Sequence, residues 1–182
     1  VASSCSERER PWDQPGAPPP PPSAAGLPNA SRPEPETPEA ARAARAAELY
    51  GRCAEGLRPS DDPVRDVVRL GTSCGPSTGM QRAFEVPREG VVGEGNRPVE
   101  LQVPLRAGRC YRVFAVAEPS VEELSVELRS SRGTTLARDR SSGRVVVLQP
   151  EGPLCAAGDD DAVVAIAARR GRGRFALELW WH

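Results

Sequence analysis

Residues suited to catalysis are scarce in this chain of 182 residues. The single histidine, His182, lies at the end of the chain, and a frayed terminus places a general base poorly beside a nucleophile. The sequence contains neither a GxSxG nor an HExxH signature and no phosphate-binding glycine loop. The glycines of GRGRF at 171–175 predict a hairpin between strands, because no helix follows them. We therefore expect no catalysis.

Three consecutive aspartates, Asp159, Asp160 and Asp161, form the best candidate for a metal site. Carboxylates in a loop supply the oxygen ligands that Ca²⁺ prefers. Aspartate is also common in turns because its side chain bonds to nearby backbone. We favour a solvated acidic turn before a strand and keep calcium binding as the alternative. No other cofactor is predicted.

Two tryptophans, Trp180 and Trp181, close the last apolar segment. In a strand they point to opposite faces, so one faces the core and the other faces solvent or a neighbouring element. An outward tryptophan can stack on a sugar or anchor a protein partner. Core packing, or cover by a helical segment, explains the pair equally well, and we favour the cover.

The five cysteines lie at positions 5, 53, 74, 110 and 155. An exported chain generally pairs its cysteines, so an odd number leaves one over. Cys5 is the odd one by context, and the other four allow three pairings. We expect the local pairing, Cys53 with Cys74 and Cys110 with Cys155, because it respects the division of the chain. A tetracysteine zinc site is the rival interpretation, but the sequence contains no CxxC pair.

Cys5 follows the small residues Ala2, Ser3 and Ser4. This pattern resembles the lipobox of bacterial lipoproteins, with Ala2 in place of the usual leucine. The resemblance implies that the Cys5 thiol carries a diacylglycerol that anchors the chain to a lipid bilayer. The alternative is a secreted protein with one free thiol, which is a liability outside the cell.

The chain divides into three parts. Residues 1–37 are proline-rich, with PPPPP at 18–22, and we expect a disordered tail or semi-rigid stalk. Residues 38–80 are predicted to be helical: alanine and arginine dominate the first helix, and a second starts near Asp61 or Asp62 and closes at Gly71. GTSCGPSTGM is a turn-rich link.

Residues 82–182 contain about eight short apolar runs separated by Gly, Pro and Ser. In CYRVFAVA the alternation sets Tyr111, Val113, Ala115 and Ala117 on one face; in LSVELRS it turns Leu124, Val126 and Leu128 inward. The pattern predicts a mainly β fold, an antiparallel β-sandwich or jelly roll. The predicted strands are AFEV, PVELQVPL, CYRVFAVA, LSVELRS, TTLARD, RVVVLQP, AVVAIAA and FALELWW.

The same region resembles the bacterial pre-peptidase C-terminal type of β-sandwich domain over about residues 82–181. The matching positions are Ala107, Gly108 and Tyr111, then Leu124, Val126, Leu128 and Gly133, then Gly171, Gly173, Phe175 and Leu177. Cys110 and Cys155 depart from the pattern. The resemblance implies a sandwich fold and a role beside a secreted peptidase.

These features predict an extracytoplasmic lipoprotein of a bacterial cell envelope, whose sandwich binds another envelope protein or serves as a structural module. A net charge of −1 gives no global attraction to nucleic acid. The alternatives are a secreted form of the chain, a carbohydrate- or calcium-binding module, and an accessory domain of a secreted hydrolase.

Overall fold

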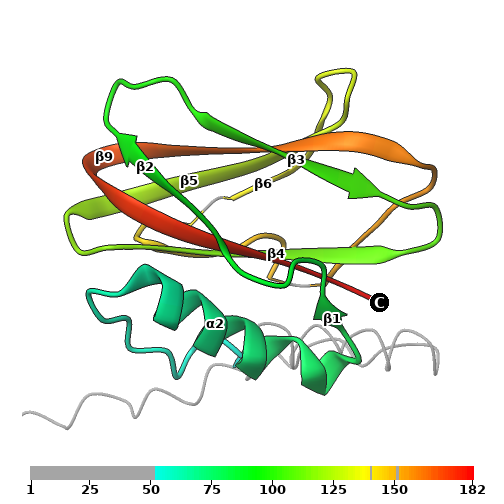
Figure 1. Ribbon diagram of the computed structural model, residues 1–182, viewed down its shortest axis with the longest axis horizontal. Helices are drawn as coiled ribbons and strands as arrows, with labels where there is room; N and C mark the ends of the chain where they lie inside the picture. The colour runs from blue at the N-terminus through cyan, green and yellow to red at the C-terminus, as the bar shows by residue number, and fades with distance from the viewer. Residues whose placement is uncertain (1–51, 140, 151) are drawn as a thin grey trace, which may run out of the picture. The chain divides into compact units, whose positions relative to one another are not determined.

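A computed structural model describes residues 52–139, 141–150 and 152–182, and Figure 1 shows their arrangement. The predicted antiparallel β-sandwich is confirmed. A single α-helix, α2 (Pro63–Cys74), and a short 3₁₀ turn, η1 (Pro76–Thr78), precede the strands in the described part of the chain. The strands are β1 (Gln81–Arg82), β2 (Arg88–Gly93), β3 (Val99–Leu105), β4 (Cys110–Ala117), β5 (Val121–Arg129), β6 (Thr135–Arg138), β7 (Val145–Val147), β8 (Leu154–Cys155) and β9 (Asp160–Trp181).

The strand β9 belongs to both layers of the sandwich. Its first half pairs with β3 and β5, and its second half pairs with β1, β2 and β4. It crosses one layer, bends back, and returns through the other (Figure 1). We call the layer of β3, β5, β6 and early β9 the far sheet, and the layer of β1, β2, β4, β7, β8 and late β9 the helix-side sheet.

The predicted hairpin at residues 171–175 is wrong, because β9 continues through it. Gly171 has a φ of +87°, and a Cβ at that position would overlap the carbonyl oxygen of Ser120. Pairing resumes at once on its far side, where Gly173 faces Val92 of β2. The glycine therefore bends a strand at a close backbone approach and does not end it. The two strands predicted from AVVAIAA and FALELWW are one.

The core lies between the two sheets, as the alternation predicts. Tyr111, Val113, Ala115 and Ala117 of β4 are buried in it. They meet Leu124, Val126 and Leu128 of β5 from the opposite layer. The other face of β4 is buried as well, since Phe114 and Val116 belong to a second apolar cluster under α2.

The helix α2 begins where the sequence predicts and ends later. The carboxylate of Asp62 accepts hydrogen bonds from the backbone N–H groups of Val64 and Arg65, and Pro63 occupies the first turn. The predicted end at Gly71 is wrong, because the helix continues to Cys74. Gly71 lies against the Trp180 side chain, so close packing of the helix on the sheet accounts for a glycine at this position.

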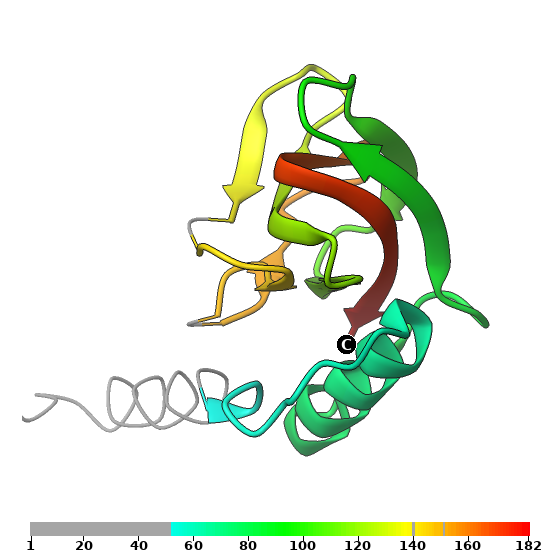
Figure 2. The same cartoon turned by 90° about the vertical axis from the view of Figure 1, so that its left-hand side faces the viewer.

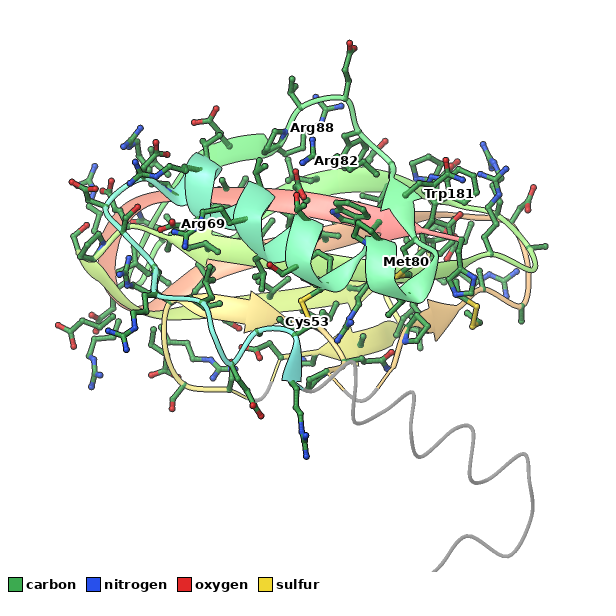
Figure 3. All side chains as sticks on the ribbon, turned by 90° about the horizontal axis from the view of Figure 1, so that it is seen from below. Cys53, Arg69, Met80, Arg82, Arg88 and Trp181 are labelled. Carbon is green, nitrogen blue, oxygen red and sulfur yellow. A yellow bond between two sulfur atoms is a disulfide. The ribbon has the colours of Figure 1, made fainter. Side chains whose placement is uncertain are left out.

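The helix covers the outer face of the helix-side sheet. Figure 3 shows it lying across that sheet, with Cys53 on one side and Arg82 on the other. Val67, Leu70, Cys74 and Met80 pack there against sheet residues that include Trp180. The helix and the sandwich thus share one compact unit, Glu36–His182. Independent folding of residues 82–182 stays a prediction, and most of the predicted first helix lies outside the described residues.

The segment that follows β1 also differs from the predicted strand order. The predicted strand AFEV, residues 83–86, forms a bend, and its Val86 is exposed. The strand β2 lies directly after Pro87, over Arg88–Gly93, a segment with weak alternation. Pairing with the second half of β9 creates this strand, and local sequence carries little sign of it.

Candidate docking groove

Both predicted disulfides are present. Cys53 is bonded to Cys74 at the end of α2, and Cys110 of β4 is bonded to Cys155 of β8. Two disulfides indicate an oxidising, extracytoplasmic location. Among the described residues, no helix has the length and apolar character needed to cross a membrane. Cys5 lies outside the described residues, so its lipidation stays a prediction.

Trp180 lies beneath the helix, and the predicted cover by the helical segment is what the structure shows. Only 5% of the side chain is exposed, and its ring meets Phe114 edge-on with centroids 6.5 Å apart. The indole N–H donates a 2.7 Å hydrogen bond to the buried carboxylate of Glu178. Burial raises the pKa of Glu178, against the opposing effects of this hydrogen bond and of Arg82. A buried Trp180 offers no platform for a sugar.

Trp181 points to the other face, as predicted. It is half-buried against the main core. The guanidinium of Arg109 lies 3.8 Å from the centre of its ring, an arrangement that contributes a cation–π attraction. The Trp181 ring is therefore covered by the chain's own Arg109 and does not form the outward-facing platform that a glycan would need.

Two of the three predicted metal ligands, Asp159 and Asp160, support loops. Asp159 accepts a 2.8 Å hydrogen bond from the backbone N–H of Ala107. Both carboxylate oxygens of Asp160 accept the N–H of Ser131 at 3.2 Å, and hydrogen bonding from Ser131 lowers the pKa of Asp160. Asp160 and Asp161 are successive residues of β9, so their side chains leave opposite faces. Among the residues that the structure describes, no three acidic, cysteine or histidine side chains form a metal-binding group.

A hollow follows the open side of the sandwich, between the ends of the two sheets. In Figure 2 the yellow β6 and the gold segment that contains β7 lie on this same side. A groove of about 590 Å³ separates them, within the usual range for binding sites. We call it the seam groove; its lining comprises Ala54, Thr135, Leu136, Ala137, Arg138, Asp139, Ser141, Val145, Val147, Gln149 and Pro150.

A second hollow of about 530 Å³ continues along the same side, between the β5–β6 turn and β8. Leu136 lines both hollows. The two hollows therefore lie along one seam, where the sheet order β6-β5-β9-β4-β7 begins and ends.

The seam groove is bordered by β7, which pairs with β4 and with no other strand of the described chain. Leu148 donates its N–H to Val113, and Ala117 donates its N–H to Arg144, so residues 144, 146 and 148 face β4. Because hydrogen-bonding direction alternates along a strand, the amides of Val145 and Val147 turn away from β4. Both residues line the groove. The amide of Arg138 on β6 turns away from β5 by the same reasoning, since Asp139 donates to Val126.

The two borders of the groove differ. β6 carries the exposed Arg138, which is paired with Glu127 at 3.0 Å, and its ladder with β5 is irregular beside Leu128. Charge and bulges are devices that protect a sheet edge from pairing. β7 consists of three valines, with no charge or proline. The edge of β7 is therefore the one suited to accept a strand.

Hydrogen bonds of two arginines, and the backbone conformation of one further residue, fix the chain at the ends of the groove. Arg112 of β4 is 1% exposed and donates to the carbonyl oxygen of Pro150 at 3.2 Å. Arg144, just before β7, donates to the carbonyls of Ser60 and Pro59 at 2.8 and 2.9 Å. Gln149 adopts a left-handed backbone, with φ of +52°, which turns the chain out of β7.

Asp139 is the notable polar group of the lining. Its side chain is 5% exposed, and Oδ1 accepts the N–H and the hydroxyl of Ser141 at 3.0 and 2.7 Å. Oδ2 is buried and has no hydrogen-bond partner among the described residues. The sequence does not single out Asp139, because one aspartate shortly before Ser-Ser-Gly indicates only a turn. Its burial depends on the packing of two sheets.

Comparisons with known proteins add little. No family model and no curated protein matches the chain. An arabinose-bound α-L-arabinofuranosidase is 13% identical over 52% of this chain and 19% of its own, with a TM-score of 0.29. A structure of infectious bursal disease virus is 7% identical over 56% of this chain and 31% of its own, with a TM-score of 0.27. The matched parts thus span less than a third of either neighbour.

Proposed function

We propose that this chain is a non-catalytic, extracytoplasmic interaction module that binds an extended segment of a partner protein in the seam groove. The observation that carries the proposal is the position of β7 at the end of the described strand order, where Val145 and Val147 line the groove and their amides turn away from β4. A segment added along such an edge gains main-chain hydrogen bonds, and the groove's side chains select among sequences.

The dimensions and lining of the groove suit this mode of binding. The facing strand β6 has 4 residues, which span about 13 Å at 3.3 Å per residue. A docked strand of four or five residues therefore fills the groove. Half-buried Leu136, Val145 and Val147 supply apolar contacts, and their burial strengthens binding in proportion to the area covered.

The test removes one edge amide without disturbing the sheet. The N–H of Val147 lies outside the β4–β7 ladder, and proline is tolerated on an edge strand whose N–H faces away from its neighbour. We expect Val147→Pro to keep the fold, checked by melting temperature. The matched control, Val147→Thr, keeps the amide and nearly the same side-chain shape.

The probe is a displayed library of random peptides, selected against the full chain attached through Cys5, the one cysteine outside the two disulfides. We expect groove-binding peptides that bind Val147→Thr and whose affinity for Val147→Pro is at least about tenfold lower. This is the effect of one lost hydrogen bond with its desolvation. Peptides that bind Val147→Pro equally well overturn strand addition at β7.

The membrane attachment is a separate part of the proposal. We propose that Cys5 is lipidated and that the proline-rich residues 6–37 hold the folded unit away from the bilayer. Several acyl chains bind a membrane firmly, whereas one binds only marginally. Native protein should therefore sediment with membranes, and Cys5→Ser should release it. A native Cys5 of unmodified mass would end this part of the proposal. Membership of the pre-peptidase C-terminal family stays a prediction.

A further inference from the structure

The buried carboxylate of Asp139 has fewer hydrogen-bond partners than its two oxygens can accept. It lies in the loop between the two edge strands and lines the seam groove. One oxygen is held by Ser141, while the other, Oδ2, is buried and has no hydrogen-bond partner in the described chain. A buried charged oxygen without a donor costs free energy, so a donor that enters the groove is favoured.

Two arginines near Asp139 that the structure describes pair with other carboxylates. Arg138 forms an ion pair with Glu127 at 3.0 Å. Arg169 forms one with Glu123 at 3.0 Å, and its second terminal nitrogen donates to the backbone carbonyl of Asp139 at 3.4 Å. These contacts fix the Asp139 loop, and no arginine of the described chain donates a hydrogen bond to the buried oxygen Oδ2 of this groove-lining residue.

We infer that the extended segment bound in the seam groove carries a lysine or arginine side chain that pairs with Asp139, an inference that rests on the proposed function. The β7 edge fixes the backbone of the segment, and Asp139 then selects a cation at one position along it. A cation that pairs with a carboxylate forms a charge-assisted hydrogen bond, which is stronger than one between neutral groups.

The geometry also sets how the cation binds. Oδ1 already accepts two hydrogen bonds from Ser141, so a guanidinium cannot take both oxygens without displacing the serine. Pairing through Oδ2 alone is open to an ammonium or to one N–H of a guanidinium. Asp139 therefore specifies positive charge and not one basic residue over the other.

The experiment uses peptides selected from the random library against the full chain. We expect a basic residue at one fixed position of the peptides that depend on the Val147 amide. A synthetic arginine peptide is then compared with the same peptide carrying citrulline, which has the shape of arginine and no charge. We expect citrulline to weaken binding at least about tenfold. Asp139→Asn should remove that difference, while Glu122→Gln, an equal change of charge outside the groove lining, should keep it.

The outcomes separate the two proposals. Selected peptides that need the Val147 amide but show no fixed basic residue, or that bind equally well with citrulline, overturn the role of Asp139 and leave strand addition standing. A selection that yields no peptide sensitive to Val147→Pro overturns both. The citrulline comparison uses the wild-type chain, so its result decides the role of Asp139 even where the Asp139→Asn variant folds poorly.

Discussion

Substituting Gly71 with alanine tests how the helix is seated on the sheet, because two effects of opposite sign meet there. Alanine in place of glycine within a helix ordinarily stabilises it by about 1 kcal/mol. At Gly71, however, the added Cβ would lie 2.6 Å from the indole nitrogen of Trp180 and would overlap a carboxylate oxygen of Glu178. Gly75, one turn later, lies against the same ring, with a Cβ position 2.8 Å from its Cδ2 atom.

The steric effect is the larger of the two. Ordinary van der Waals contact begins at about 3.4 Å, so either the helix lifts from the sheet or the ring moves, and such overpacking costs about 1–3 kcal/mol. The 2.7 Å hydrogen bond from Trp180 to Glu178 is strained by the same movement, and a buried hydrogen bond to a charged group contributes about 1.5–3 kcal/mol. After the gain in helix propensity is subtracted, we expect Gly71→Ala to destabilise the fold by about 2 kcal/mol.

Thermal unfolding of the full chain measures this directly. A loss of about 2 kcal/mol lowers the melting temperature by about 4–8 °C in a protein of this size. The control, Thr72→Ala, changes the neighbouring exposed residue and should raise stability by a few tenths of a kcal/mol, in line with propensity. In a Trp180→Leu background the cost of Gly71→Ala should fall, because the contact with the indole ring is removed while the contact with Glu178 stays. A rise in melting temperature for Gly71→Ala alone would refute the close seating of α2 on Trp180.

Three other measurements probe the buried carboxylate, the sandwich disulfide and the acidic turn. Burial raises the pKa of Glu178, so the folded state binds this proton more tightly than the unfolded state does. The linked stability is therefore present at low pH and is lost as pH rises through the folded pKa. Denaturant titrations between about pH 4 and about pH 8 should show that loss in wild type and in Glu122→Gln, and not in Glu178→Gln. The Cys110–Cys155 bond closes a loop with a sequence separation of 45, so replacing both cysteines by serine should cost about 4 kcal/mol in the chain-entropy model; an unchanged melting temperature would contradict this. Calcium titration by calorimetry should give no heat, because Asp159 and Asp160 already accept backbone hydrogen bonds; micromolar binding would overturn this interpretation of the acidic turn.

Much of the β architecture follows from local pattern. Alternation in CYRVFAVA and LSVELRS identifies the strands β4 and β5 and the faces they bury, because side chains leave a strand on opposite faces in turn. The cap at Asp62 and the proline at position 63 set the start of α2. The disulfide pairs follow from the division of the chain, which keeps each pair close in sequence. These features depend on neighbours along the chain.

Long-range packing decided the rest. Gly171 has the same local signature whether it ends a strand or bends one, and only pairing with β2 and β5 on its two sides makes β9 continuous. Gly71 similarly indicates a helix end until Trp180 packs against it. The seam groove is the clearest case: β6 and β7 lie at opposite ends of the strand order, only closure of the sandwich brings them to one groove, and the groove-lining Asp139 is buried. Residue types and spacing determine which surfaces are apolar, but which strand edges face each other is a property of the closed sandwich, since it depends on contacts between residues far apart in the chain.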